Sequence, residues 1–246
     1  MIFDARHRAD NLGALCIALM YAVLLGAIGW LLLGNHDTAF LHPRFRPFLA
    51  GSAAILCGFA VGALSDFRSG KARERWYAAI LKSLVLITPV LFMGAVAGQS
   101  MGVQALANRA VALDTDTFGI YSQDEAAGAG IDDTQQKRSL LQIARTMRQL
   151  DGRPVETEGM VYSDGNMPAR FLLLFRFGIY CCAADAIPVW VLVDKGQAPA
   201  MENEQWVRVA GILRVTPING RELPVIIADD ITPMPSPPPG AQYLFF

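Results

Sequence analysis

Residues 171–194 read FLLLFRFGIYCCAADAIPVWVLVD, two strongly apolar runs that meet at an adjacent cysteine pair. Cys181 and Cys182 form this pair, and Asp185 follows three residues later. Short apolar runs bounded by turn residues are typical of buried β-strands. The stretch therefore predicts two neighbouring strands whose connecting turn carries two thiols and a carboxylate.

The backbone at the cysteine pair decides what these groups can do. In a continuous strand Cys181 and Cys182 would point to opposite faces of the sheet and could not bind one ion. A turn over residues 183–186 would let them converge. Three interpretations stay open: one thiol packs in the core and the other lies near the turn; Cys181, Cys182 and Asp185 bind a soft or transition-metal ion; or the pair forms a strained, easily reduced disulfide. Asp185 also fits the role of a side chain that caps the turn.

The sequence after residue 153 predicts a small all-β domain. Turn-forming residues separate five expected strands, at 154–162, 170–181, 187–194, 206–215 and 223–231. Gly159 and Gly211 lie in the middle of expected strands, where a glycine often marks a bulge or a barrel corner. The predicted fold is an OB-like five-stranded barrel, with a small sandwich as the alternative.

An amphipathic helix is expected just before the first strand, over residues 134–150. Thr134 is the expected N-cap, and Gly152 follows the end. Basic residues occupy one face and apolar residues the other, and we expect the apolar face to pack on its own domain rather than on a membrane surface. The apolar face consists of Leu140, Leu141, Ile143, Ala144, Met147 and Leu150.

The first part of the chain has the composition of a membrane protein. The whole chain is 53% hydrophobic and 17% charged, whereas soluble domains carry about 25% charged residues. Three apolar runs, at about 12–33, 48–65 and 76–97, are long enough to span a bilayer as helices. We therefore expect an all-α transmembrane region over residues 1–110 in contact with the lipid bilayer. The net charge of −1 is not that of a nucleic-acid-binding protein.

The basic residues around the spans predict the orientation. Six of them lie on the side of the amino terminus (Arg6, Arg8, Arg68, Lys71, Arg73 and Arg75), and three on the other side (Arg44, Arg46 and Arg109). The positive-inside rule then places the amino terminus in the cytoplasm and the C-terminal domain outside. Beyond the spans we expect an acidic linker at 111–133, a soluble domain at 134–234, and a proline-rich aromatic tail at 235–246 that needs a partner surface.

Enzymatic chemistry is not expected. All three histidines precede residue 43, so none is available in the second half to activate Cys181 or Cys182. The sequence has no phosphate-binding loop and no pair of acids at catalytic spacing. A zinc site of the Cys/His type is not expected either, because the second half of the chain has no spaced CxxC motif and no histidine.

Several motifs resemble those of a known family. RFGIYCCAADAIPVWVLV is similar to the RF-x-I-x-CC-x-ADA-x-P signature of the YcgQ-like bacterial membrane proteins. LHPRFRPFL resembles the HPR element of that family, and ITPVLFMG, QWVRVAGIL and the proline-rich tail with Tyr243 are similar too. The loop DFRSGKARERW lacks the histidine-rich stretch that many relatives carry there, which argues against metal collection by that loop.

The resemblance implies a function that the residues alone do not. It implies an accessory subunit of a two-component permease in the bacterial inner membrane, paired with a multi-span permease of the YraQ type. The external domain would dock on the permease or gate it. The alternatives are a stand-alone metal-binding or redox-sensing domain that uses Cys181 and Cys182, and a purely structural envelope protein. The resemblance does not name the transported species.

Overall fold

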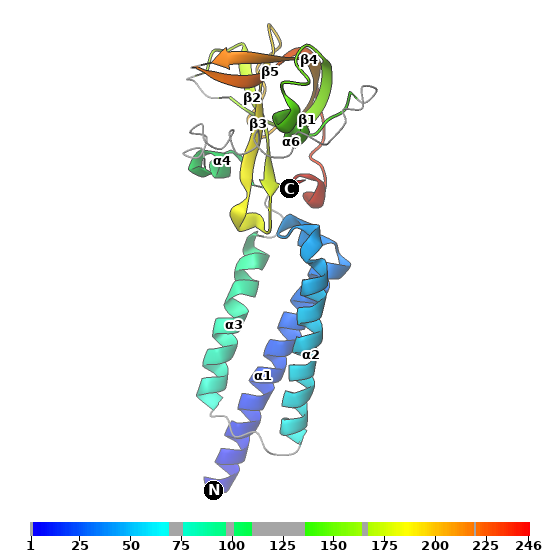
Figure 1. The fold of residues 1–246 in the computed structure, drawn as a ribbon. Helices are drawn as coiled ribbons and strands as arrows, with labels where there is room; N and C mark the ends of the chain where they lie inside the picture. Colours follow the sequence, from blue (N-terminus) through cyan, green and yellow to red (C-terminus); the bar gives the residue numbers. More distant parts are fainter. Residues whose placement is uncertain (1, 69–75, 97–100, 110–135, 164–166, 219) are drawn as a thin grey trace. The chain divides into compact units, whose positions relative to one another are not determined.

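The structure is a computed structural model that describes residues 2–68, 76–96, 101–109, 136–163, 167–218 and 220–246 (Figure 1). The chain divides into two compact units, Met1–Gln99 and Ser100–Phe246, which we call the helical unit and the β unit. The expected acidic linker, 111–133, lies outside the described residues. The helical first part and the all-β second part of the sequence-based prediction are confirmed.

Three long helices make up the helical unit: α1 (Ile2–Leu33), α2 (Arg46–Arg68) and α3 (Trp76–Val96). Helix α1 packs against both of the others (Figure 1). Two of the helices carry stretches long and apolar enough to cross a membrane, Leu15–Leu33 and Pro43–Ser65. The third expected span is also a helix, and its apolar stretch is shorter, at Tyr77–Phe92.

Most apolar side chains of these helices are not covered by protein. Large exposed apolar side chains lie on all three helices. Ten of them are Leu15, Leu19, Trp30, Phe48, Ile55, Phe59, Leu81, Leu84, Leu91 and Phe92. Apolar surface of this extent is unfavourable in water and marks contact with lipid or with another protein. Among the described residues of the helical unit, no protein covers these side chains.

An ion pair holds the connection between α1 and α2, which includes the short 3-10 helices His36–Ala39 and Pro43–Phe45. Asp37 is only 1% exposed, and its Oδ2 lies 3.0 Å from Nε of Arg46. Arg46 also donates to the carbonyl oxygen of Leu32 and to Oδ1 of Asn35, at 2.9 and 2.7 Å. Carbonyls in the last turn of a helix have no partner within the helix, so this arginine caps α1.

The β unit contains the five expected strands and one short additional strand. They are β1 (Pro154–Tyr162), β2 (Phe171–Ile179), β3 (Ile187–Asp194), β4 (Trp206–Ile218), β5 (Arg221–Pro233) and β6 (Leu244–Phe245). The bounds of β1 and β3 match the prediction, whereas β4 and β5 are longer because they continue as a hairpin to Ile218 and Arg221.

The five longer strands pair in a ring. The order is β1-β4-β5-β3-β2, with a further pairing of β1 to β2 and with β6 beside β2. All pairings within the ring are antiparallel except that of β3 with β5. Only three residue pairs join β1 to β2, from Met160 with Phe175 to Tyr162 with Leu173. The ring is thus closed by a short seam and is not a clear barrel.

Gly211 is the site of a β-bulge, as its position in the sequence predicts. The register between β4 and β5 shifts between Ala210 and Gly211. A Cβ atom at Gly211 would overlap the carbonyl oxygen of Ile227, so only glycine allows the two strands to approach this closely. Gly159 is in a similar but looser place, where a Cβ atom would lie 2.9 Å from the carbonyl oxygen of Phe175.

The expected helix at 134–150 is too long at both ends. Helix α6 runs over Leu140–Thr146, and Ser139 caps it in a capping box with Gln142. The residues before it pair with β1 instead, because the backbone N–H of Arg138 donates to the carbonyl oxygen of Glu156 at 2.8 Å. The expected cap, Thr134, lies outside the described residues. All six apolar residues of the expected face are buried in the core against β1, β2 and β3, so this helix packs on its own unit.

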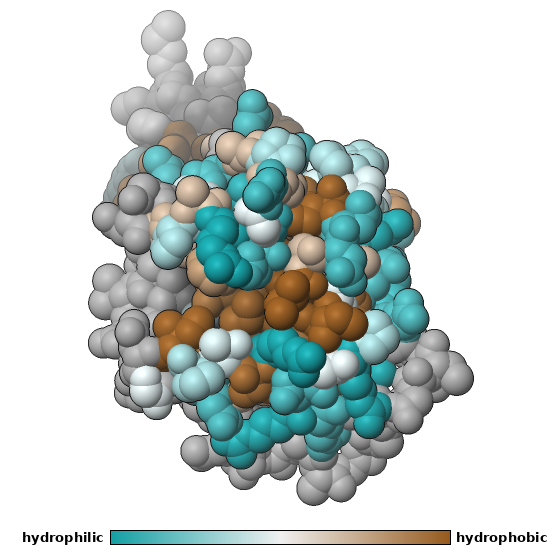
Figure 2. All heavy atoms as spheres, turned by 90° about the horizontal axis from the view of Figure 1, so that it is seen from above, coloured by the Kyte–Doolittle hydropathy of each residue, from teal (hydrophilic) through white to brown (hydrophobic). Residues whose placement is uncertain are grey.

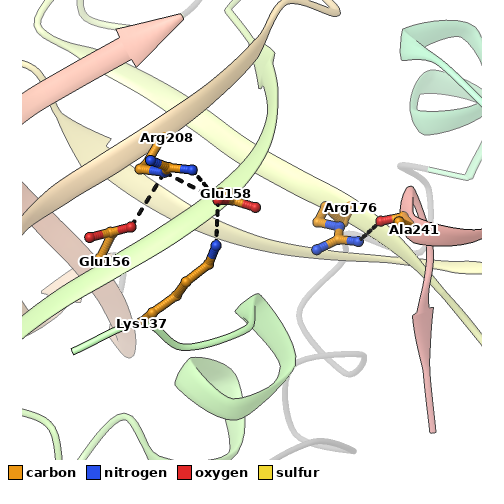
Figure 3. Close-up of polar contacts among 6 residues, drawn as sticks. All are labelled: Lys137, Glu156, Glu158, Arg176, Arg208 and Ala241. Carbon is orange, nitrogen blue, oxygen red and sulfur yellow. Dashed lines mark hydrogen bonds and ion pairs between the residues drawn. The ribbon is translucent and has the colours of Figure 1, made fainter. Parts of the chain in front are cut away.

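The C-terminal tail finds its partner surface on β2 of the same chain. Strand β6 pairs with β2 in parallel, and the backbone N–H of Phe246 donates to the carbonyl oxygen of Ile179 at 3.3 Å. The guanidinium of Arg176 on β2 lies over the ring of Trp206 and donates to three consecutive tail carbonyls. These carbonyls belong to Ala241, Gln242 and Tyr243. Figure 3 shows the contact with Ala241. The tail is therefore clamped to the sheet next to the end of β2.

One face of the molecule combines apolar and hydrophilic side chains. In Figure 2 a group of apolar side chains lies in the middle of this face and hydrophilic side chains border it. Large exposed apolar side chains of the β unit include Ile227, at 46% exposure, and Tyr180, at 61%. Such groups are common on protein surfaces, so they do not by themselves define a site.

Candidate metal centre

The hairpin of β2 and β3 positions the cysteine pair. Its last residue pair is Gly178 with Ile187, and β2 ends at Ile179, two residues before Cys181. A short 3-10 helix, Ala183–Asp185, then reverses the chain. The strand therefore does not continue through the cysteines, which was the condition for their side chains to converge.

The turn brings the two thiols and the carboxylate together. Sγ of Cys181 and Sγ of Cys182 are 3.7 Å apart. These two sulfur atoms and a carboxylate oxygen of Asp185 all lie within 4.8 Å of one another. All three side chains are half-buried, so neither thiol is packed away in the core. Among the described residues, this is the group of ligand atoms that could hold a metal ion.

Asp185 organises the turn through its carboxylate. Oδ2 accepts hydrogen bonds from the backbone N–H groups of Cys181 and Cys182, at 2.7 and 3.4 Å. Oδ1 accepts from the backbone N–H of Tyr180 at 3.1 Å. Burial would raise the pKa of Asp185, but these bonds and one from the Cys181 thiol outweigh it and hold the pKa below its ordinary value. The capping role expected for Asp185 is therefore confirmed.

The same carboxylate keeps the nearer thiol protonated. Its hydrogen bond with Asp185, followed by that with Cys182 and by desolvation, raises the pKa of Cys181 from about 9.0 to about 11. Only the thiolate is a good nucleophile and metal ligand. Without an ion, Cys181 is thus a weakly reactive thiol at neutral pH, and binding an ion would release its proton.

A second cluster, of charged residues on β1 and β4, was not anticipated from the sequence. Glu158 accepts from Nζ of Lys137 at 2.7 Å and from Nη2 of Arg208 at 2.9 Å, and Nε of Arg208 also lies 3.3 Å from Glu156 (Figure 3). Burial acts to raise the pKa of Glu158, and its hydrogen bonds to Lys137 and Arg208 lower it below the ordinary value. The signal in the sequence was the alternation of Glu156 and Glu158 on one strand face, and the register then places Arg208 opposite Glu158. All the charges of this cluster are matched, so it is a structural network.

The fold and the site together define a β domain with a thiol–carboxylate turn, on a chain that also has long apolar helices. The chain matches the family model of the DUF1980 C-terminal domain over residues 123–245 and belongs to this family. This membership is consistent with the resemblance to the YcgQ-like proteins.

No curated protein matches the chain. Among solved structures, the telomere capping protein Ten1 from Saccharomyces pombe matches at 16% sequence identity with a TM-score of 0.25. The match covers 40% of this chain and 79% of that protein.

Proposed function

We propose that the protein is an accessory membrane subunit of a two-component permease in the bacterial inner membrane. Its three helices α1, α2 and α3 would span the bilayer, with the amino terminus in the cytoplasm. The β unit, built as an OB-like barrel, would lie outside and dock on a multi-span permease of the YraQ type or gate it.

The observation that carries this proposal is the uncovered apolar surface of the helical unit. Large apolar side chains such as Leu19, Phe59 and Leu84 are exposed on α1, α2 and α3. Lipid can cover such side chains, and so can the helices of a partner. The ion pair of Asp37 with Arg46 lies at one end of this apolar surface, between α1 and α2, where charged groups are expected in a membrane protein.

Helix α2 has a face suited to a partner helix. Gly51, Gly58 and Gly62 are all exposed, and a Cβ atom added to any of them would meet nothing within 4 Å. Glycines let helix backbones approach closely in lipid. None of the residues that the structure describes fills this space, so it would be open to a helix of the permease.

Co-purification tests the proposal. The tagged chain is solubilised in mild detergent, and proteins that stay with it are identified by mass spectrometry. We expect a multi-span membrane protein in a fixed ratio to the chain, and we expect Gly58→Ile with Gly62→Ile to reduce its recovery. Gly58→Ala with Gly62→Ala keeps small residues at both positions and is the matched control, which should retain more of the partner than the isoleucine pair does. A chain that repeatedly purifies alone would contradict the proposal.

A second candidate function is that of a metal-binding or redox-sensing domain that acts without a permease. It is favoured by the convergence of Cys181 and Cys182, whose sulfur atoms are 3.7 Å apart. The two candidates differ in what survives purification. A domain that acts alone keeps its response to ions or oxidants without any partner, whereas a permease subunit is recovered with one.

A further inference from the structure

We propose that Cys181, Cys182 and Asp185 form a binding site for one tetrahedral divalent ion of the zinc class, with the fourth position open to solvent. This inference deepens the second candidate function. It rests on the geometry of the turn, so it holds or fails independently of a permease partner.

The separation of the sulfur atoms selects the geometry. Two thiolates on a tetrahedral ion, each at about 2.3 Å from it, are about 3.8 Å apart. Cys181 and Cys182 already have their sulfur atoms 3.7 Å apart. A linear arrangement with the same bond lengths would need about 4.6 Å. The ion can therefore enter between the two thiols without a movement of the turn.

Asp185 supplies the third ligand and is held in place for it. A carboxylate has about four acceptor positions, and backbone N–H groups occupy three of them, one on Oδ1 and two on Oδ2. Ligating carboxylates in metal proteins are commonly oriented by such hydrogen bonds. The fourth position accepts from the Cys181 thiol when no ion is bound, and a metal-bound thiolate has no proton to donate, so this position is then open to the ion. One carboxylate oxygen and the two sulfur atoms lie within 4.8 Å of one another.

The set of ligands selects the class of ion. Two thiolates and one carboxylate suit zinc and similar borderline ions, whereas calcium and magnesium prefer oxygen ligands alone. Three protein ligands leave one position for water or for a donor atom from another molecule. Because the three side chains are half-buried rather than enclosed, an ion bound here can exchange.

Cobalt(II) is the probe, since it binds zinc sites and absorbs visible light strongly when its geometry is tetrahedral with sulfur ligands. The test uses the full chain in detergent with Cys16→Ala and Cys57→Ala, which we call the two-cysteine chain, reduced and kept free of oxygen. We expect one cobalt per chain, the tetrahedral spectrum, and displacement by zinc. Cys181→Ser and Cys182→Ser should each weaken cobalt binding by more than the 10- to 100-fold that the loss of an outer-shell partner costs.

Asp229→Asn is the matched control, because Asp229 is an exposed carboxylate on β5 of the same unit. It should bind cobalt as tightly as the two-cysteine chain does. Near-ultraviolet circular dichroism checks that the serine variants are folded. Cobalt binding that is equal with and without the two thiols would overturn the proposal, and so would a weak spectrum typical of octahedral cobalt.

Discussion

Oδ2 of Asp185 accepts a hydrogen bond from the backbone N–H of Cys181 at 2.7 Å. This bond ties the carboxylate to the residue whose thiol it also contacts. One side chain therefore closes the turn, sets the protonation of Cys181 and offers an oxygen ligand beside the two sulfur atoms.

The first prediction concerns the reactivity of Cys181. In the two-cysteine chain with Cys182→Ser, Asp185→Asn removes the charge that stabilises the thiol. The pKa of Cys181 should then fall toward its ordinary value, because the hydrogen bond with Asp185 is the largest cause that raises it. Each unit of pKa changes the thiolate fraction about tenfold. We expect alkylation at pH 8 to become at least about tenfold faster. Asp229→Asn should leave the rate unchanged, and an unchanged rate in Asp185→Asn would show that the carboxylate does not control this thiol.

The second prediction concerns how the stability that the ion pair of Arg170 with Asp194 contributes depends on pH. This pair lies at the open end of the hairpin of β2 and β3. Asp194 accepts a hydrogen bond from Arg170, and this bond is the largest cause that lowers the pKa of Asp194. The pKa of an aspartate in the unfolded chain is about 3.9. The pair therefore stabilises the folded state above that pH, and this stabilisation is lost as the pH falls through the lower pKa of Asp194 in the folded state.

Arg170→Met should therefore lower the Tm at pH 7, and the difference should disappear as the pH falls below about 4. Thermal unfolding followed by near-ultraviolet circular dichroism measures it. Arg148→Met removes a cation from a pair in which both side chains are more exposed and should have a smaller effect. A difference for Arg170→Met that persists at low pH would exclude this pair as its origin.

The third prediction concerns the clamp on the tail. Arg176 is half-buried. Burial lowers its pKa below the ordinary value, but an arginine stays charged. A hydrogen bond to a charged group contributes about 1.5–3 kcal/mol. Arg176→Lys keeps the charge and loses the planar fork, so amides of residues 241–246 should exchange with solvent at least about tenfold faster. Hydrogen exchange read by mass spectrometry is the measurement, and unchanged protection of the tail would mean that β6 is held without the clamp.

The fourth prediction concerns the bulge at Gly211. Gly211→Ala places a Cβ atom against the backbone of Ile227, and neither group can move away without breaking the sheet. Overpacking costs about 1–3 kcal/mol of unfolding free energy, and backbone clashes lie at the upper end. Gly159→Ala, where the contact is looser, should cost less. The two variants are compared by their denaturant midpoints, and equal midpoints would contradict the role of the bulge.

Local pattern was sufficient for much of the β unit. Apolar runs and the turn residues between them located all five long strands, because short apolar runs bounded by turns are typical of strands in a sheet. The bulge at Gly211 was predictable since glycine is rarely placed inside a strand without cause. The start of α6 was not, because residues 136–138 pair with β1, a tertiary contact that overrides helix propensity.

The site could be predicted only in part. The residues Cys181, Cys182 and Asp185 were identified from their types and spacing, but whether the thiols converge depends on where β2 ends. The contacts of Arg176 with the tail and of Arg46 with Asp37 join residues far apart in the chain or in different elements. Such contacts leave no periodic trace in the sequence.

X-ray absorption at the zinc edge of the zinc-loaded two-cysteine chain tests the central claim most directly. The site predicts two sulfur neighbours at about 2.3 Å and two lighter neighbours at about 2.0–2.2 Å, from Asp185 and from solvent. Cys182→Ser should reduce the sulfur neighbours to one. A spectrum with only oxygen or nitrogen neighbours would contradict the claim that the turn of Cys181 and Cys182 binds the ion.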